Sequence, residues 1–257
     1  MKIHISKKKI GSIFLGLGML FFVILLTPAA ERVSSFATTN LERKLPIYCV
    51  QTDEPKISVS FDAAWGADDT DELLRILKEN NVKATFFLCG YWVEKYAEEV
   101  QKIADAGHDL GNHSATHPHM AQQTSEQITE ELQKCHKSIK DLTGIDMDLF
   151  RPPFGEYDNE VIETAKQNGY YTIQWDIDSL DWKEQGADAE INQVLNHKHL
   201  GNGSIILFHN DAKYTPQVLD TILKGLKNKG FEIVPISQLI HRSEFEINHE
   251  GRQIPKT

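Results

Sequence analysis

Short apolar runs alternate with longer amphipathic segments along most of this chain. The run 57–61 alternates apolar and polar residues, whereas 83–88 and 204–208 are almost wholly apolar, as strands buried on both faces are. Between the runs, apolar residues recur three or four positions apart, the period of a helix with one buried face. The pattern predicts strands near 57–61, 83–88, 108–112, 147–150, 170–177, 204–208 and 231–236. It predicts helices from about residue 69 and near 91–106, 124–142, 159–168, 189–199 and 216–229.

Helix-terminal residues support several of these boundaries. Asp69 and Glu72 have the spacing of a capping box, which predicts that Asp69 caps the first helix. The helix 124–142 is the clearest, because its apolar residues are spaced at four, three, four and three positions and Gly144 follows it. The helix 216–229 has a proline at its start and a glycine just past its end.

Regular repetition of strand and helix predicts a parallel α/β sheet with right-handed crossovers. Such a sheet is either closed as a barrel or open and doubly wound, and about seven consecutive units favour a distorted (β/α) barrel. We expect one domain over residues 55–240, preceded by a linker at 31–54 and followed by a loose polar tail at 241–257.

The first thirty residues predict a membrane segment. Residues 10–30 carry no charge, 10–26 are nearly all apolar, and four lysines precede them, which places the N-terminus in the cytoplasm and the body outside. The apolar run is longer than in most signal peptides and slightly short for a spanning helix. We favour an uncleaved anchor, with a cleaved signal ending near the small residues at 35–37 as the alternative.

Composition narrows the functional classes. The body is acidic, with a net charge of −10 for the 257 residues, which argues against nucleic-acid binding because that is built from clustered Lys and Arg. The three cysteines show no metal-binding spacing. We expect Cys89 and Cys135 to be buried thiols rather than ligands, and a disulfide of Cys49 stays open.

Ionisable residues follow five of the predicted strands. Parallel α/β folds place their chemistry at the carboxyl ends of the strands, so these side chains should gather at one mouth. They are Asp62 after the first strand, His113 and His117 after the third, Arg151 after the fourth, Asp178 and Asp181 after the fifth, and His209 after the sixth.

These residue types suggest metal-assisted hydrolysis. His113 and His117 are four residues apart, a metal-ligand spacing if they share one face of a helical turn, although a surface histidine before Pro118 would look the same. A divalent cation there would acidify a water and polarise a carbonyl, while Asp62 would accept a proton and His209 would return one. Arg151, on a proline-stiffened segment, suits a fixed partner for a carboxylate, or a surface ion pair of little consequence.

Five motifs in order resemble those of the polysaccharide deacetylases, carbohydrate esterase family four. They are SFDAAWG at 60–66, HSATH at 113–117, RPPFG at 151–155, DSLDW at 178–182 and LFH at 207–209. The resemblance spans about residues 56–240, and the first and fourth motifs resemble the spore-associated, Gram-positive branch. It implies a distorted (β/α) barrel that removes N-acetyl groups from a glycan and releases acetate.

The resemblance also implies roles for the residues that activate the attacking water. Asp62 would be the general base, oriented by Arg151. His113 and His117 would bind one divalent ion, zinc first and cobalt, nickel or manganese as alternatives.

The remaining roles concern the acetyl group and the departing amine. His209 would be the general acid, tuned by Asp181, and the backbone N–H near Phe154 would help to stabilise the oxyanion. Trp182 and Leu207 would line the pocket for the acetyl methyl.

One position departs from the family pattern. The first motif normally has a second aspartate that binds the metal, and here that residue is Ala63. An N-acetylated glycan remains the expected partner, with peptidoglycan first and chitin oligomers next, together with the membrane through the N-terminal segment. The alternatives are a glycan-binding protein without turnover and an esterase that removes O-acetyl groups, as on xylan.

Overall fold

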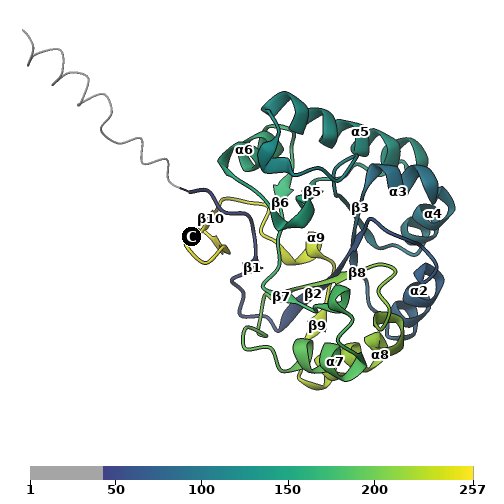
Figure 1. The fold of residues 1–257 in the computed structure, drawn as a ribbon. Helices are drawn as coiled ribbons and strands as arrows, with labels where there is room; N and C mark the ends of the chain where they lie inside the picture. The colour runs from purple at the N-terminus through teal and green to yellow at the C-terminus, as the bar shows by residue number, and fades with distance from the viewer. Residues whose placement is uncertain (1–42, 257) are drawn as a thin grey trace, which may run out of the picture. The chain divides into compact units, whose positions relative to one another are not determined.

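A curled sheet of eight parallel strands runs through the computed structural model, which describes residues 43–256 (Figure 1). The strand order is β6-β5-β4-β3-β2-β8-β7, and β9 pairs with the first residues of β2. The strands are β2 (Lys56–Ala63), β3 (Thr85–Leu88), β4 (Asp109–Asn112), β5 (Leu149–Phe150), β6 (Tyr171–Thr172), β7 (Ile177–Asp178), β8 (Ile205–His209) and β9 (Glu232–Ile233). The expected parallel α/β architecture is therefore confirmed.

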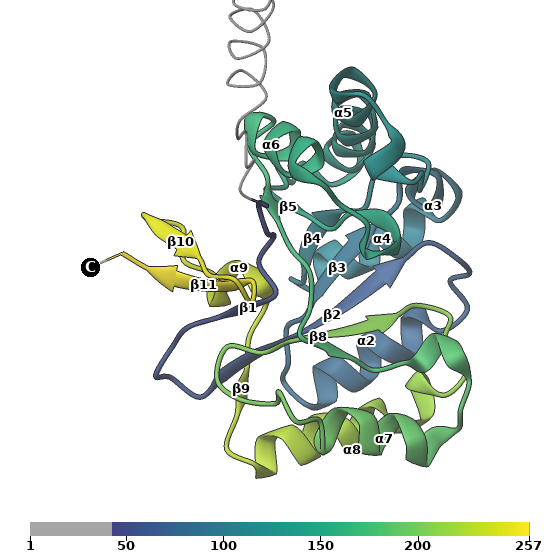
Figure 2. The same cartoon turned by 60° about the vertical axis from the view of Figure 1, so that its left-hand side comes forward.

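Most helices cover the outside of this sheet, and their apolar faces form the larger core against that side of the strands (Figure 2). The other side is filled by a smaller cluster that includes Phe87, Leu149 and Ile205, together with Ile236 from one short helix. The helices are α2 (Thr70–Glu79), α3 (Gly90–Lys95), α4 (Ala97–Asp105), α5 (Ser125–Thr143), α6 (Asn159–Gln167), α7 (Ala187–Leu195), α8 (Thr215–Asn228) and α9 (Ile236–Leu239).

The sheet is a half-barrel, because its two edge strands do not pair with each other. The single strand expected at 170–177 is instead two short strands, β6 and β7, at opposite edges. Only residues 173–176 join them, so the two edges lie within about 18 Å of each other. The Gln174 N–H donates to Ile47 at 2.7 Å on one side and the Asp176 N–H to Ile205 at 3.2 Å on the other. The chain itself thus spans the opening that a hydrogen-bonded ladder would close.

The helix boundaries follow the sequence signals in most places. Thr124 and Gln127 form a capping box at the start of α5, and Gly144 ends it in the left-handed conformation. At α2 the expectation is corrected. Asp69 occupies the N-cap position, but its side chain makes no capping hydrogen bond and instead accepts the Asp211 N–H at 2.8 Å. The helix expected at 91–106 is interrupted at Tyr96 and forms α3 and α4.

The last residues of the chain belong to a second, small sheet. Strand β11 (Arg252–Pro255) pairs in parallel with β1 (Cys49–Val50) and antiparallel with β10 (Phe245–Ile247). The expectation of a loose tail after residue 240 is therefore wrong, because this segment is hydrogen-bonded to the residues that enter the domain. Cys49 lies in β1 as a buried free thiol, like Cys89 and Cys135, so no disulfide forms.

The anchor or signal expected within residues 1–30 lies outside the described residues. Of the helices within 43–256, none is long and apolar enough to cross a membrane.

Candidate active site

Asp62 lies at the centre of the group of strand ends. It is buried at the carboxyl end of β2, with β3 on one side and β8 on the other, and its register partners are Phe87 and His209. The ends of β4, β5 and β8 supply His113, Arg151 and His209. The sheet therefore brings together the residues that the sequence placed at separate strand ends.

A buried ion pair holds Asp62. Arg151 Nη1 donates to Asp62 Oδ1 at 2.6 Å, and Nη2 donates to Ser60 Oγ at 2.9 Å and to the Gln174 carbonyl at 3.2 Å. The guanidinium lies 4.1 Å from the centre of the Phe87 ring. Burial raises the pKa of Asp62, but the charge of Arg151 and then the nearby histidines lower it by more, so the pKa lies below its ordinary value. Asp62 is thus an ionised carboxylate, and Arg151 is not a surface residue.

His113 is fixed in one orientation by the backbone. Its Nδ1 lies 2.7 Å from the Arg151 carbonyl oxygen, which can only accept, so Nδ1 carries the proton and donates. Nε2 is left with a lone pair and lies 3.7 Å from Asp62 Oδ2. A backbone carbonyl that holds the second ring nitrogen in this way is typical of metal-binding histidines.

His117 reaches the same place by a loop and not by the helical turn that the spacing suggested. Ser114 and His117 have left-handed backbones, with φ of 67° and 57°. The Ser114 hydroxyl accepts the His117 N–H at 2.9 Å, and the carboxylate of Glu131 on α5 accepts the amides of Ala115 and Thr116. The rings of His113 and His117 nevertheless lie 5.0 Å apart between centres, so the pair is brought together.

The donor set fits a divalent cation. Burial lowers the pKa of His113, and burial together with His113 lowers that of His117 to about 4, so both rings are neutral as metal ligands must be. Cys89, directly after β3, is the third group, since one ligand atom each from Cys89, His113 and His117 lie within 4.8 Å of one another. Ala63, buried at the end of β2, supplies no ligand.

His209 is held by the second carboxylate of the site. Asp181 Oδ1 accepts from His209 Nδ1 at 2.7 Å, and Asp181 Oδ2 accepts the His209 backbone N–H at 2.7 Å. Burial lowers the pKa of His209, but Asp181 raises it by more, and the net pKa lies above the ordinary value. Asp181 therefore favours the protonated imidazole, and it leaves Nε2 unengaged.

Four aromatic side chains are exposed around these groups, and we call them the aromatic rim: Trp65, Tyr91, Phe154 and Trp182. The Trp65 ring is 52% exposed and stacks on His209 at 5.2 Å, whereas the Phe154 ring is 57% exposed and lies 4.5 Å from His117. These four are the large exposed apolar side chains within residues 43–256. Each follows the end of a strand, so all four lie at the mouth of the half-barrel.

The other expected pocket residues differ in exposure and backbone conformation. Trp182 is 50% exposed beside Asp181, but Leu207 is buried inside β8. Phe154 has a left-handed backbone with φ of 59°. Its turn is closed by hydrogen bonds from the amides of Gly155 and Glu156, and the Phe154 amide donates neither of them.

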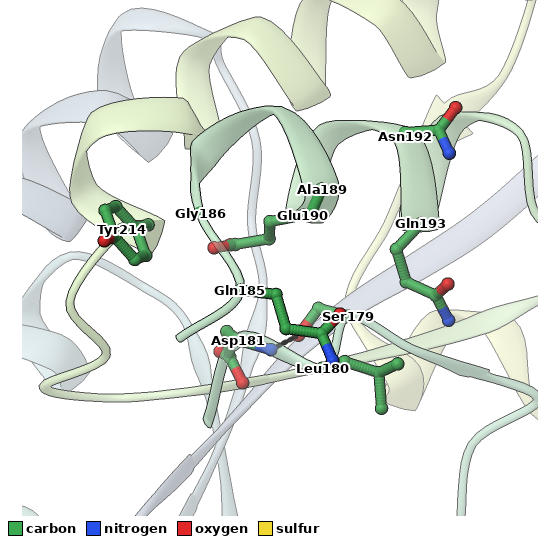
Figure 3. Close-up of a pocket in the computed structure, with 10 residues that line it drawn as sticks. All are labelled: Ser179, Leu180, Asp181, Gln185, Gly186, Ala189, Glu190, Asn192, Gln193 and Tyr214. Atoms are coloured by element: carbon green, nitrogen blue, oxygen red, sulfur yellow. Dashed lines mark hydrogen bonds between the residues drawn. The ribbon is translucent and has the colours of Figure 1, made fainter. Parts of the chain in front are cut away.

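A polar cavity of about 180 Å³ has Asp181 in its wall (Figure 3). Glu190 on α7 is buried beside it, and the Thr215 hydroxyl lies 2.9 Å from Glu190 Oε1 and 3.3 Å from Asp181 Oδ2. Burial raises the pKa of Glu190 to about 7. The lining consists of Ser179, Leu180, Asp181, Gln185, Gly186, Ala189, Glu190, Asn192, Gln193 and Tyr214.

Sequence reasoning missed three parts of this arrangement. Trp65 could have been noticed as an aromatic residue in the loop just after Asp62. Cys89 directly follows a predicted strand, the same signal that identified the other candidates. Glu190 lies on the buried face of a predicted helix, where a glutamate is unusual.

Comparison with known proteins agrees with this geometry. The polysaccharide deacetylase family model matches residues 50–173. The chain is 32% identical over 193 residues to a peptidoglycan-N-acetylglucosamine deacetylase of Bacillus cereus, covering 74% of this chain and 70% of that protein. It is 29% identical over 211 residues to the peptidoglycan-N-acetylmuramic acid deacetylase PdaA of Bacillus subtilis, covering 80% of each. It is also 34% identical to YlxY of Bacillus subtilis, covering 76% of this chain but only 60% of YlxY.

Among solved structures, the chain is similar to BA3943 of Bacillus anthracis, described as a pseudoenzyme of carbohydrate esterase family four. The TM-score is 0.72 at 34% identity, covering 76% of this chain and 68% of BA3943. A mutant of BA3943 described as having restored enzymatic activity matches with a TM-score of 0.73 at 36% identity, covering 76% and 70%.

Fold and site together are those of carbohydrate esterase family four, the class to which the compared structures belong. The chain belongs to the polysaccharide deacetylase family.

Proposed function

We propose that this protein hydrolyses N-acetyl groups of peptidoglycan in a metal-dependent reaction outside the cytoplasm and releases acetate. The observation that carries the proposal is that two differently built charge pairs lie at one mouth. Arg151 Nη1 donates to Asp62 Oδ1 at 2.6 Å, which favours a carboxylate base, and His209 Nδ1 donates to Asp181 Oδ1 at 2.7 Å, which favours a protonated imidazole acid. Amide hydrolysis needs a base for the water and an acid for the amine, and these two groups supply both.

The first half of the reaction is attack of water on the acetyl carbonyl. The chemistry that a divalent cation supplies when held by His113 and His117 is polarisation of that carbonyl and a lower pKa for the attacking water. Asp62 accepts the proton of the water, and Arg151 keeps the carboxylate ionised and oriented for this transfer. The Phe154 amide stabilises the oxyanion that develops on the carbonyl oxygen.

The second half is departure of the amine. An amide nitrogen is a poor leaving group until it is protonated, so His209 donates its proton as the C–N bond breaks. Asp181 holds the ring by Nδ1 and stabilises its charged form until the transfer. The products are acetate and a free amine on the sugar.

The aromatic rim supports a glycan substrate. Exposed aromatic faces offer flat apolar surfaces on which the faces of sugar rings can stack, and the rim surrounds both catalytic pairs. Peptidoglycan is the first choice because both deacetylases compared above are named for it, with chitin oligomers second. The predicted N-terminal anchor or signal would place the domain on the side of the membrane where peptidoglycan lies.

The experiment is an assay of acetate release by the purified full-length chain loaded with zinc. Peptidoglycan, chitin oligomers and O-acetylated xylan are compared, and free amines are counted on the glycan products. We expect acetate together with new amines from peptidoglycan. Acetate from xylan alone would identify an esterase, and no acetate from any of these substrates with zinc, cobalt, nickel or manganese would contradict the proposal.

One observation favours a second candidate, a glycan-binding protein without turnover. Ala63 removes an anionic metal ligand expected for the family, and BA3943 is a related pseudoenzyme. This candidate predicts glycan binding that is unchanged in the His209→Ala variant, and acetate release that begins only in the Ala63→Asp variant.

A further inference from the structure

The loss of a carboxylate at position 63 coincides with a thiol in its immediate surroundings. Ala63 is the register partner of Leu88 in β3, and the Cys89 N–H donates to the Ala63 carbonyl at 3.1 Å. Cys89 is fully buried, and its Sγ donates to the His113 carbonyl at 3.2 Å. Cys89 thus contacts the backbone of Ala63 through its amide and that of His113 through its thiol.

We propose that Cys89 is the third protein ligand of the metal and takes the place of the missing aspartate. The proposal stands on the cluster of Cys89, His113 and His117, whose ligand atoms lie within 4.8 Å of one another. Cysteine thiolate and histidine nitrogen are both common zinc ligands, and catalytic zinc sites have three protein ligands and an open fourth position. This assignment of Cys89 rests on the proposed function in one respect, that a metal binds at the histidine pair.

A thiolate ligand changes which metals the site selects. Sulfur is a soft donor that favours zinc and similar ions, whereas a carboxylate also suits manganese and magnesium. Cys89 binds as the thiolate, which restores the negative charge lost with the aspartate. We therefore expect this chain to prefer zinc and cobalt over manganese more strongly than a family member with a carboxylate at this position.

The neighbouring thiol of Cys135 provides a matched control. It is also fully buried and also donates to a backbone carbonyl, that of Leu88 at 3.2 Å. It is not part of the ligand cluster. Cys135→Ser therefore reproduces the chemical change of Cys89→Ser without reaching the metal.

The test is metal spectroscopy on the full-length chain. In zinc X-ray absorption of the unmodified protein, we expect one sulfur neighbour at about 2.3 Å together with nitrogen neighbours at about 2.0 Å. With cobalt, we expect a thiolate-to-metal charge-transfer band that remains in Cys135→Ser and disappears in Cys89→Ser. Zinc affinity should fall at least about tenfold in Cys89→Ser. Loss of a residue that only hydrogen-bonds to a metal ligand already lowers affinity by about 10–100-fold, and loss of the ligand itself should cost no less.

The outcomes separate this inference from the proposed function. Zinc bound by nitrogen and oxygen alone, or a charge-transfer band that is retained in Cys89→Ser, would overturn the role of Cys89 and leave the deacetylase proposal intact. Failure of the unmodified chain to bind zinc or cobalt would overturn both. If Cys89→Ser does not fold, as judged by circular dichroism, the absorption spectrum of the unmodified protein decides the question by itself.

Discussion

Two carboxylates at the mouth of the half-barrel face two different cations. Asp62 is buried against the guanidinium of Arg151, a group that stays charged at any pH at which the protein folds. Asp181 is buried against the imidazole of His209, which is partly exposed and can lose its proton. The distances are alike, 2.6 Å and 2.7 Å, so the difference lies in the chemistry of the partner.

The difference shows how one fold can prepare a base and an acid side by side. A permanent cation lowers the pKa of Asp62 and keeps it ready to accept a proton. A hydrogen-bonded carboxylate raises the pKa of His209 and so favours the form that can donate one.

The largest effect is expected when the base is removed. Asp62→Asn should lower kcat for acetate release by about 10²–10⁴-fold, because an amide cannot accept the proton of the water. The rate is measured at saturating glycan with the metal bound. Asp68→Asn, the same change at an exposed position in the following loop, should leave the rate within twofold of the unmodified protein, that is about 0.4 kcal/mol. A tenfold loss or less in Asp62→Asn would contradict the role.

The next effect is on stability. Arg151→Met leaves the Asp62 carboxylate buried without a partner, so the free energy of unfolding near neutral pH should fall by about 3–5 kcal/mol in urea titrations. Since Asp62 has a lowered pKa in the folded protein, its pair contributes stability above the unfolded pKa and loses it as pH falls through the folded pKa. The difference between the two proteins should therefore shrink in acid.

A double variant tests the interpretation of that loss. Asp62→Asn combined with Arg151→Met removes both charges, so it should be more stable than Arg151→Met alone. Equal or lower stability would mean that the packing of Arg151, rather than its charge, supports Asp62.

The role of His209 is tested by the pH dependence of the rate rather than by stability. His209 has a raised pKa, so its protonated form persists above the ordinary value and is lost as pH rises through the raised one. Asp181→Asn should move the alkaline limb of kcat/KM to lower pH by about one unit, a tenfold loss of rate on that limb. An unmoved limb would show that a different group is titrating.

The smallest effect is expected at the aromatic rim beside the acid. Trp65→Ala removes a ring stacked on His209 and exposed to substrate, so KM for the glycan should rise about two- to tenfold. Trp182→Ala, next to Asp181, should act in the same direction. An unchanged KM in both variants would exclude the rim as a sugar-binding surface.

The strand ends could be predicted from the sequence because the signal is local. A buried apolar run followed by an ionisable residue is readable at 57–62 and at 204–209, and a parallel sheet then forces these ends together. The same logic predicts which residues form the site, and the resemblance to the family predicts that Arg151 is the partner of Asp62.

The parts that could not be predicted depend on contacts distant in sequence. The loop with left-handed backbones at Ser114 and His117 is held by Glu131 of α5, which accepts the Ala115 amide. No pattern within the loop sequence predicts this conformation. The division of 170–177 into β6 and β7 depends on where the curled sheet stops pairing. Cys89 follows a predicted strand like the other candidates, but a cysteine at the end of an apolar run is equally typical of a core thiol, and its nearness to the histidines comes from the fold.

The segment that joins β6 to β7 has a consequence for how this enzyme can vary. Residues 173–176 cross the open side of the sheet, and within them the Gln174 carbonyl accepts from Arg151 while the Trp175 ring lies 5.5 Å from its guanidinium. The same four residues therefore connect the two edges of the sheet and hold the guanidinium of Arg151, which neutralises Asp62. An insertion in this segment would loosen the connection between the sheet edges and also displace Arg151. Insertions should therefore be poorly tolerated here, although the segment is a loop.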